Sequence, residues 1–372
     1  MTAASEDLVT VFLCGDVMTG RAIDQILPHP SDPRIYEEAV SDARTYIELA
    51  EEVNGPIPRP VNQSYIWGDA LAELQQVGPD ARIVNLETSV TRNDEPWPKG
   101  INYRMNPANV GCLTAAGIDV CVLANNHVLD YVDAGLEETL ETLQRAGIAT
   151  AGAGRTLAEA RRPAVIDLAA GSRVVVHGFG TRSSGIPPSW AAAEDRSGVD
   201  FLADLSKETA ATIEQRVEAV RRSGDITIVS IHWGSNWGYE VPSAHTRFAC
   251  RLIDGGVDIV HGHSSHHPRP IEVYRGRVIL YGCGDFLNDY EGISGFEQYR
   301  ADLALMYFLT VDRAGGELVQ LRLVPMQIRK MRSCRATPRD ARWLADRLGR
   351  VSIPFGSWAE MAEGGHLLLR WG

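Results

Sequence analysis

The sequence lacks the features that mark several common classes of protein. It has no run of 18 apolar residues, so no transmembrane helix or membrane anchor is expected. The apolar run at residues 8–14 is too short for the hydrophobic part of a signal peptide, and no basic segment precedes it. There is no G-x-S-x-G motif of serine hydrolases, and no Lys-Ser/Thr follows Gly152-Ala153-Gly154 as in a phosphate-binding loop. These absences favour a cytoplasmic protein with other chemistry.

Positive charge and paired cysteines are also scarce. The formal net charge is −12, which disfavours nucleic acid as a partner because phosphate backbones bind basic surfaces. An anionic small molecule remains compatible with this charge, since a bound metal cation reverses the local field. The six cysteines contain no C-x-x-C pair and are expected to be small buried hydrophobic side chains.

Potential metal ligands follow several predicted strands. Apolar, β-branched runs predict buried strands at residues 9–14, 82–86, 118–123, 225–231 and 257–261. Carboxylate, amide or imidazole side chains occur where these strands end: Asp16, Glu87, Asn126, His127, His232, His263 and His266. We expect one edge of the sheet to gather them, as in a di-metal hydrolytic site.

Histidines are concentrated in one short segment. Residues 261–267 hold four of the ten histidines, a density that favours metal binding over a solvated loop. Separately, His127 is suited to general acid chemistry near neutral pH, and Asp130 three residues later can orient its ring.

The order of elements predicts a mixed α/β architecture. Strands and helices alternate in the first two-thirds of the chain, with one helix within residues 36–53. Hairpins are expected at 164–178 with a turn at 169–172, at 271–281 and at 304–325, and a last helix near 339–348. We expect one domain over 8–330, with insertions at about 28–64 and 181–203. Residues 331–372 are expected to form a C-terminal extension packed on that domain.

The motifs occur in a recognisable order. They are Gly15-Asp16-Val17-Met18 with Arg21, Asn85-Leu86-Glu87, Asn125-Asn126-His127 with Asp130, His232-Trp233-Gly234, and Gly262-His263-x-x-His266. This set resembles the CapA family of poly-gamma-glutamate capsule synthesis proteins, which is similar to the calcineurin-like metallophosphoesterases. The resemblance covers about residues 8–325. It implies a four-layer α-β-β-α sandwich, with two mixed sheets packed face to face and helices outside.

The resemblance also implies roles for individual residues. The implied metal ligands are Asp16, Glu87, Asn126, His232, His263 and His266, with Glu87 as the bridging carboxylate. His127 is the implied general acid, assisted by Asp130. Substrate contacts are expected from Arg21, Arg104, Trp233 and Glu240, although extra residues precede Glu240 here.

The sequence departs from the family pattern at three points. Val17-Met18 stands where phosphoesterases complete an Asp-x-His pair, so either one or two divalent ions are expected, of Mn, Fe or Zn. His261 and His267 are additional histidines that offer alternative ligands. The usual Gly-Asn-Phe is Gly284-Asp285-Phe286.

The expected function is a metal-dependent hydrolase acting on a phosphoester or a gamma-glutamyl type of amide. Two alternatives stay open. One is a non-hydrolytic partner in polyglutamate or cell-envelope biosynthesis. The other is a tailoring enzyme of a small-molecule pathway, whose long loops shape a pocket. The expected ligand is an anionic small molecule or polyglutamate, and a homo-oligomer is compatible with the sequence.

Overall fold

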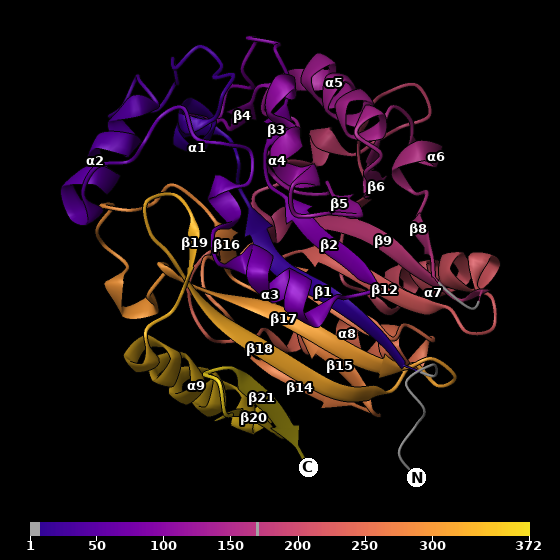
Figure 1. The fold of residues 1–372 in the computed structure, drawn as a ribbon. Coiled ribbons are helices and arrows are strands. Elements are labelled where there is room, and N and C mark those ends of the chain that lie inside the picture. Colours follow the sequence, from indigo (N-terminus) through magenta and orange to yellow (C-terminus); the bar gives the residue numbers. More distant parts are fainter. Residues whose placement is uncertain (1–7, 169–170) are drawn as a thin grey trace.

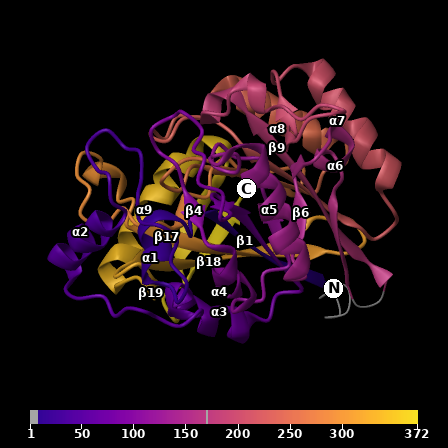
Figure 2. The same cartoon turned by 90° about the horizontal axis from the view of Figure 1, so that it is seen from above.

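The computed structural model describes residues 8–168 and 171–372. Residues 1–7, and positions 169–170 of the expected turn, lie outside the described residues. Two mixed β-sheets face each other, and helices cover their outer faces (Figures 1 and 2). This is the four-layer α-β-β-α sandwich that the sequence predicts.

The first sheet combines strands from both ends of the chain. Its order is β20 (Ser357–Met361), β21 (Leu367–Trp371), β18 (Leu318–Ile328), β17 (Leu303–Asp312), β1 (Leu8–Val17), β2 (Ala81–Leu86), β5 (Val120–Val122) and β6 (Ala149–Ala151). Strand β16 (Asp285–Leu287) pairs with β1, and β19 (Ser333–Arg335) pairs with β18. Strands β1, β2, β5 and β6 are parallel, so their carboxyl ends meet at one edge.

The second sheet carries the histidine-rich strands. Its order is β11 (Phe201–Leu202), β9 (Arg173–Thr181), β12 (Ile226–His232), β13 (Ile259–His263), β15 (Arg277–Leu280) and β14 (Ile271–Tyr274), with β8 (Ala164–Asp167) beside β9. Strands β9, β12, β13 and β15 are parallel. The predicted hairpins are confirmed as the antiparallel pairs β8–β9, β14–β15 and β17–β18.

Two short strand pairs and the helices complete the structure. The pairs are β3 (Ser89–Val90) with β4 (Arg104–Met105), and β7 (Ala153–Gly154) with β10 (Gly198–Val199). The helices are α1 (Arg21–Ile26), α2 (Arg44–Asn54), α3 (Ala70–Val77), α4 (Gly111–Thr114), α5 (Val132–Arg145), α6 (Leu157–Ala160), α7 (Lys207–Val220), α8 (Ser243–Asp254) and α9 (Pro338–Ser352). Figure 2 shows α7 and α8 on the side opposite α3 and α4.

The two-residue periodicity of each strand sets which side chains face the middle layer. In β1, Val11 and Leu13 pack between the sheets, while Phe12 and Cys14 pack toward the helices. In β12, Ile226 and Ile228 pack between the sheets, so the same alternation continues to Ser230 and His232. The chemistry-bearing side chains therefore emerge between the sheets, at the carboxyl ends of parallel strands.

The insertion at 28–64 differs from its prediction in one respect. The helix expected within 36–53 begins only at Arg44. Residues 34–42 form a narrow turn instead, with an Arg34–Asp42 bridge and a bond from Ile35 N to Ser41 O. The Asp42 carboxylate accepts the backbone N–H of Arg44 at 2.9 Å, a local bond that competes with helix before this point.

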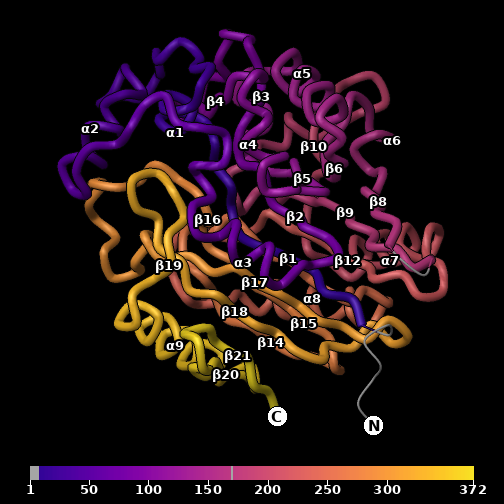
Figure 3. The backbone as a smooth tube through the Cα atoms, viewed as in Figure 1, coloured from indigo at the N-terminus to yellow at the C-terminus, as the bar shows by residue number. Residues whose placement is uncertain are grey.

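The C-terminal segment after residue 330 continues the first sheet. Strand β21 pairs with β18, and the side chains of α9 join the core between the sheets. Near the end of β18 at Ile328, the segment after β16 lies beside α2, as the indigo and orange tubes of Figure 3 show. Asn54 there donates to Glu291 at 2.5 Å. Across residues 8–168 and 171–372, no helix has the length and apolar character needed to cross a membrane.

Candidate functional site

The carboxyl ends of β1, β12 and β13 bring three buried metal-binding side chains together. Ligand atoms of Asp16, His232 and His263 all lie within 4.8 Å of one another. The two histidines are register partners on neighbouring parallel strands, and so are Ser230 and His261 two residues earlier. Strand pairing thus places two imidazoles from distant parts of the chain side by side, opposite the carboxylate of the other sheet.

Hydrogen bonds fix which imidazole nitrogens face the cluster. Nε2 of His263 contacts the Ser230 hydroxyl at 2.9 Å, so its Nδ1 is the nitrogen directed to Asp16, at 3.7 Å. His232 Nε2 lies 2.9 Å from the amide oxygen of Asn126 and 3.7 Å from Glu87 Oε1. Asn126 and Glu87 are therefore part of the same cluster.

The two carboxylates of the cluster are buried next to each other. The Asn85 amide donates to Asp16 Oδ1 at 2.7 Å. Burial raises the pKa of Asp16 to about 7, and burial together with Asp16 raises the pKa of Glu87 well above its usual value. Two adjacent buried carboxylates beside neutral imidazoles form a donor set that fits a divalent cation.

A glycine allows Asp16 to reach this position. Gly15 passes so close to the loop before β16 that a Cβ there would lie 1.5 Å from the Gly284 carbonyl oxygen. The bond from Asp16 N to Gly284 O, 2.9 Å long, ties the two segments together. Only glycine permits this approach of the two backbones.

His266 lies at the same edge and is held by a residue that sequence reasoning did not include. Its Nδ1 is 3.0 and 3.1 Å from the two carboxylate oxygens of Asp285, the register partner of Asp16 in β16. Burial opposes protonation of His266, but the Asp285 charge prevails and raises its pKa. The signal in the sequence was Gly284-Asp285-Phe286, at the position of the family's Gly-Asn-Phe. Asp285 orients the ring and leaves Nε2 as its remaining nitrogen.

His127 belongs to a chain of three polar side chains beside the cluster. Its Nδ1 is 2.6 Å from Asp130 Oδ2, and Lys99 Nζ is 2.6 Å from Asp130 Oδ1. Its Nε2 faces Glu87 Oε1 at 3.9 Å. Burial lowers the pKa of His127 to about 4, although Asp130 opposes this. No sequence pattern pointed to Lys99, because it lies in an irregular loop.

The other two histidines of the 261–267 segment have structural contacts. His261 contacts Ser230 Oγ at 3.0 Å and the Cys14 carbonyl oxygen at 2.8 Å, so both of its nitrogens are hydrogen bonded. The Nδ1 of His267 contacts the Pro268 carbonyl oxygen at 3.1 Å, and its ring stacks on Tyr299. Neither ring joins the cluster at Asp16.

A cavity of about 600 Å³ opens over the cluster. Its walls include Glu87, Asn126, His127 and His266 together with aromatic and charged side chains from the insertion and from the segment after β16. Three further charged residues line the cavity: Arg21 from α1, Glu37 from the insertion and Lys99 from the loop after β3. Polar side chains from the strand ends therefore form one side of the cavity, and aromatic and charged side chains form the rest of its wall.

Of the four residues expected to contact substrate, Arg21 alone lines this cavity. Arg104 donates to the carbonyl oxygen of Asn93 at 2.8 Å and lies over the Tyr131 ring. Trp233 is buried against α8, where it stacks on His245. Glu240 is exposed, and its carbonyl oxygen accepts from Arg269 at 2.9 Å.

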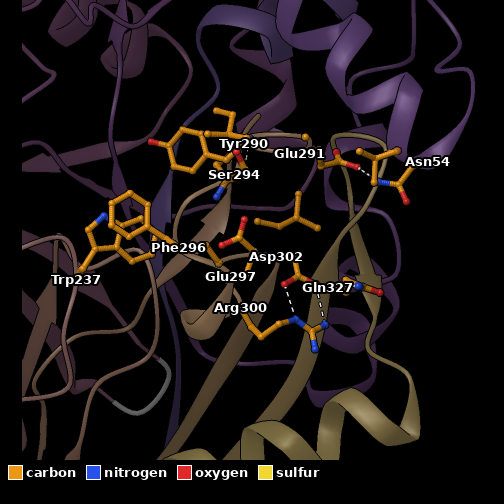
Figure 4. Close-up of a pocket in the computed structure, with 16 residues that line it drawn as sticks. Asn54, Trp237, Tyr290, Glu291, Ser294, Phe296, Glu297, Arg300, Asp302 and Gln327 are labelled. Atoms are coloured by element: carbon orange, nitrogen blue, oxygen red, sulfur yellow. Dashed lines mark hydrogen bonds and ion pairs between the residues drawn. The ribbon is translucent and has the colours of Figure 1, made fainter.

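A second pocket of about 370 Å³ adjoins the first. The two share Trp237, Tyr290, Ile293 and Phe296. Figure 4 shows Trp237 and Phe296 stacked on one side of it, with ring centroids 4.1 Å apart, and the Arg300–Asp302 pair on another. The aromatic pair thus forms a wall common to both pockets.

The sequence is similar to that of several known proteins. The family model described as bacterial capsule synthesis protein PGA_cap matches residues 10–290. A probable polyglutamine synthesis accessory protein of Mycobacterium tuberculosis is 49% identical over 356 residues, which cover 95% of this chain and 94% of that protein. The PGA biosynthesis protein CapA of Bacillus subtilis is 27% identical over 313 residues, covering 84% of this chain and 70% of that protein.

A solved structure from Thermus thermophilus aligns with a TM-score of 0.36 at 10% identity, covering 84% of this chain and 97% of that chain. A likeness this weak bears on neither fold nor function. The family model spans most of the chain, and five residues of the ordered motifs line one cavity: Arg21, Glu87, Asn126, His127 and His266. The chain belongs to the bacterial capsule synthesis protein PGA_cap family.

Proposed function

We propose that this protein is a hydrolase that depends on divalent metal ions and cleaves an amide or phosphoester bond in the cavity beside the Asp16 cluster. The observation that carries the proposal is the grouping of Asp16, His232 and His263 within 4.8 Å of one another, next to Glu87 and Asn126, which line that cavity. Glu87, Asn126 and His266 are the further ligands we propose. Bound ions would activate a water molecule and stabilise negative charge developing on the substrate.

The residues of the chain divide the remaining work. His127 is the proton carrier, because its Nδ1 is engaged by Asp130 and its Nε2 faces Glu87. Nε2 takes a proton in the cavity and returns one to the leaving atom. Lys99 and Asp130 hold the ring in this orientation through their ion pair. The Tyr103 ring stacks on His127 at 4.0 Å and excludes water from one face.

The substrate we propose is an amide of the gamma-glutamyl type. The Bacillus subtilis relative is named for PGA biosynthesis, and the Mycobacterium tuberculosis relative for polyglutamine synthesis. A phosphoester suits the same donor set and is the other substrate to test. The manganese, iron and zinc forms all match the mixed nitrogen and oxygen ligands.

The test starts from protein stripped with a chelator and reloaded separately with Mn²⁺, Fe²⁺ or Zn²⁺. Each form is assayed on gamma-glutamyl-p-nitroanilide and on bis-p-nitrophenyl phosphate. We expect turnover to return with at least one metal and to be absent in Asp16→Asn. Full turnover in the stripped protein contradicts the proposal.

A non-hydrolytic role in polyglutamate synthesis is the alternative, and the word accessory in the Mycobacterium tuberculosis relative's name favours it. Under this alternative no metal restores turnover, while the reloaded protein still binds polyglutamate. Equilibrium dialysis with labelled polyglutamate separates the two outcomes.

A further inference from the structure

The guanidinium of Arg21 is held by two carboxylates of different origin. Asp289 binds it from the sheet side, with Oδ2 2.8 Å from Nε and Oδ1 bonded to Nη2. Glu37 binds it from the insertion, with Oε1 2.8 Å from Nη1. One cation thus faces two anions, although Asp289 alone balances its charge.

Three tyrosine rings enclose this guanidinium. Its central carbon lies 3.6 Å from the ring centroid of Tyr46, 5.1 Å from that of Tyr103 and 5.7 Å from that of Tyr290. Arg21 itself has a φ of +48°, a left-handed conformation that a non-glycine residue adopts at a cost. Stacking on aromatic rings and a planar fork of N–H donors are the properties that suit an arginine to bind a carboxylate.

The box opens onto the candidate metal site. Arg21, Glu37 and Tyr46 line the same cavity as Glu87, His127 and His266. Tyr103 stacks on His127, and Tyr290 meets His266 edge-on with centroids 5.3 Å apart. The two tyrosine hydroxyls are 2.9 Å apart. One tyrosine ring therefore separates the Arg21 box from each of these histidines.

Glu37 is the replaceable partner of Arg21. Asp289 is fully buried and also accepts the backbone N–H of Ala22 at 3.0 Å, so it is fixed by the fold. Glu37 lies in the turn at 34–42, whose backbone bonds, Ile35 N to Ser41 O and the Arg34–Asp42 bridge, close on the turn itself. Ile35 anchors this turn in the core, so exchange at the box requires only that the Glu37 side chain turn away from Arg21.

We propose that the Arg21 box is a binding subsite for a substrate carboxylate, and that Glu37 occupies it in the absence of substrate. Nη1 of Arg21 and the Tyr46 hydroxyl, which donates to the other Glu37 oxygen, are the two donors of the subsite. A substrate carboxylate must displace Glu37, because a third carboxylate on one guanidinium has no balancing charge. The turn at 34–42 then acts as a competitor for the subsite.

The subsite narrows the substrate class of the proposed function, on which this inference rests. The reacting bond lies at the Asp16 cluster, and a free carboxylate lies one tyrosine ring away, at Arg21. A glutamyl amide has this form, with its carboxylate a few bonds from the amide carbonyl. A simple phosphoester without a second anionic group lacks the ligand for the box.

The test is glutarate binding by isothermal titration calorimetry to the full, metal-loaded chain. Removal of the competitor in Glu37→Ala raises the fraction of open subsite, so we expect glutarate to bind at least about tenfold more tightly than to the wild type. Glu38→Ala is the matched control, because Glu38 is the neighbouring carboxylate on the same turn and does not line the cavity. Its affinity for glutarate should equal that of the wild type, and glutaramide, which has no charge, should bind all variants equally.

Second-site changes separate the box from direct binding of glutarate to the metals. In the Glu37→Ala background, Tyr46→Phe removes one donor and should lose part of the gain in glutarate affinity. Arg21→Met in the same background should lose all of that gain. A Glu37→Ala affinity no higher than the wild-type value overturns the inference. Because binding is the readout, tighter binding without any turnover refutes only the proposed hydrolysis, whereas turnover without tighter binding refutes only the subsite.

Discussion

The imidazoles of His232 and His263 lie against each other with their Nδ1 atoms 2.8 Å apart. Burial lowers the pKa of both rings well below the usual value, and His232 further lowers that of His263. The two Nδ1 atoms are within hydrogen-bond distance of each other, and His263 Nδ1 is also 3.7 Å from Asp16 Oδ1. Strand pairing therefore brings two imidazoles and a carboxylate together as a candidate metal site.

The first prediction concerns metal content. His263→Ala removes a nitrogen ligand and should lower bound metal by at least about tenfold, the scale on which loss of supporting groups acts at metal sites. Elemental analysis of the purified variant after dialysis measures it. His29→Ala, at an exposed histidine, is the control and should retain wild-type metal content. Equal metal in both variants would remove His263 from the ligand set.

The second prediction separates His127 from the ligands. His127→Gln should lower kcat by about 10²–10⁴, the usual contribution of a positioned proton carrier, while metal content stays at the wild-type level. Steady-state assay of the reloaded enzyme with elemental analysis provides both readouts.

The Lys99–Asp130 ion pair that supports the His127 ring should have a smaller effect on kcat. Lys99→Met removes the cation 2.6 Å from Asp130, so the ring loses part of its support and kcat should fall less than in His127→Gln. A loss of metal in either variant would mean that these residues act on the cluster itself.

The third prediction is structural. Gly15→Ala places a methyl group on the Gly284 carbonyl oxygen, and should lower the free energy of unfolding by about 3 kcal/mol or more, since two backbones must separate. Gly349→Ala is the matched control. Gly349 lies in α9, and the nearest atoms to an added Cβ are the backbone atoms of Ala359 at 3.9 Å. The free energy of unfolding should therefore rise by about 0.5–1 kcal/mol. Urea unfolding curves measure both, and equal stability of the two variants would contradict the role of Gly15.

The fourth prediction concerns pH and a histidine outside the cavity. His177 in β9 is buried, neither ring nitrogen has a partner among the described residues, and burial lowers its pKa to about 4. The unfolded chain binds the proton near pH 6.5, so between pH 6.5 and 4 unfolding takes up a proton and stability falls as pH falls. Above pH 6.5 His177 is neutral in both the folded and the unfolded chain, so this loss of stability is absent there.

His177→Leu should remove this loss, which amounts to about 3 kcal/mol over the window. Unfolding free energies of variant and wild type at pH 7 and pH 4.5 measure the difference. The exposed His29→Leu variant should keep the wild-type pH dependence. A His177→Leu protein as acid-sensitive as the wild type would show that the ring is charged when folded.

The sequence by itself determined the strands and the residues at their ends. The apolar, β-branched runs of β1 and β12 are a local pattern, so they predict strands without knowledge of partners, and the polar residue after each run follows directly. The order of the motifs then identified the family and the sandwich. The two-residue periodicity of a strand places His261 and His263 on one face of β13, but it does not say which of the two histidines joins the Asp16 cluster.

The tertiary structure decided which of these side chains act together. His261 lies one step deeper, where the Cys14 carbonyl oxygen and Ser230 take both nitrogens, and His263 lies at the open end. Lys99, Asp285 and Glu37 join the site through contacts between distant parts of the chain. Gly284-Asp285-Phe286 marked Asp285 in the sequence, but no local pattern marked Lys99 or Glu37, because such contacts depend on how the two sheets and the insertion pack.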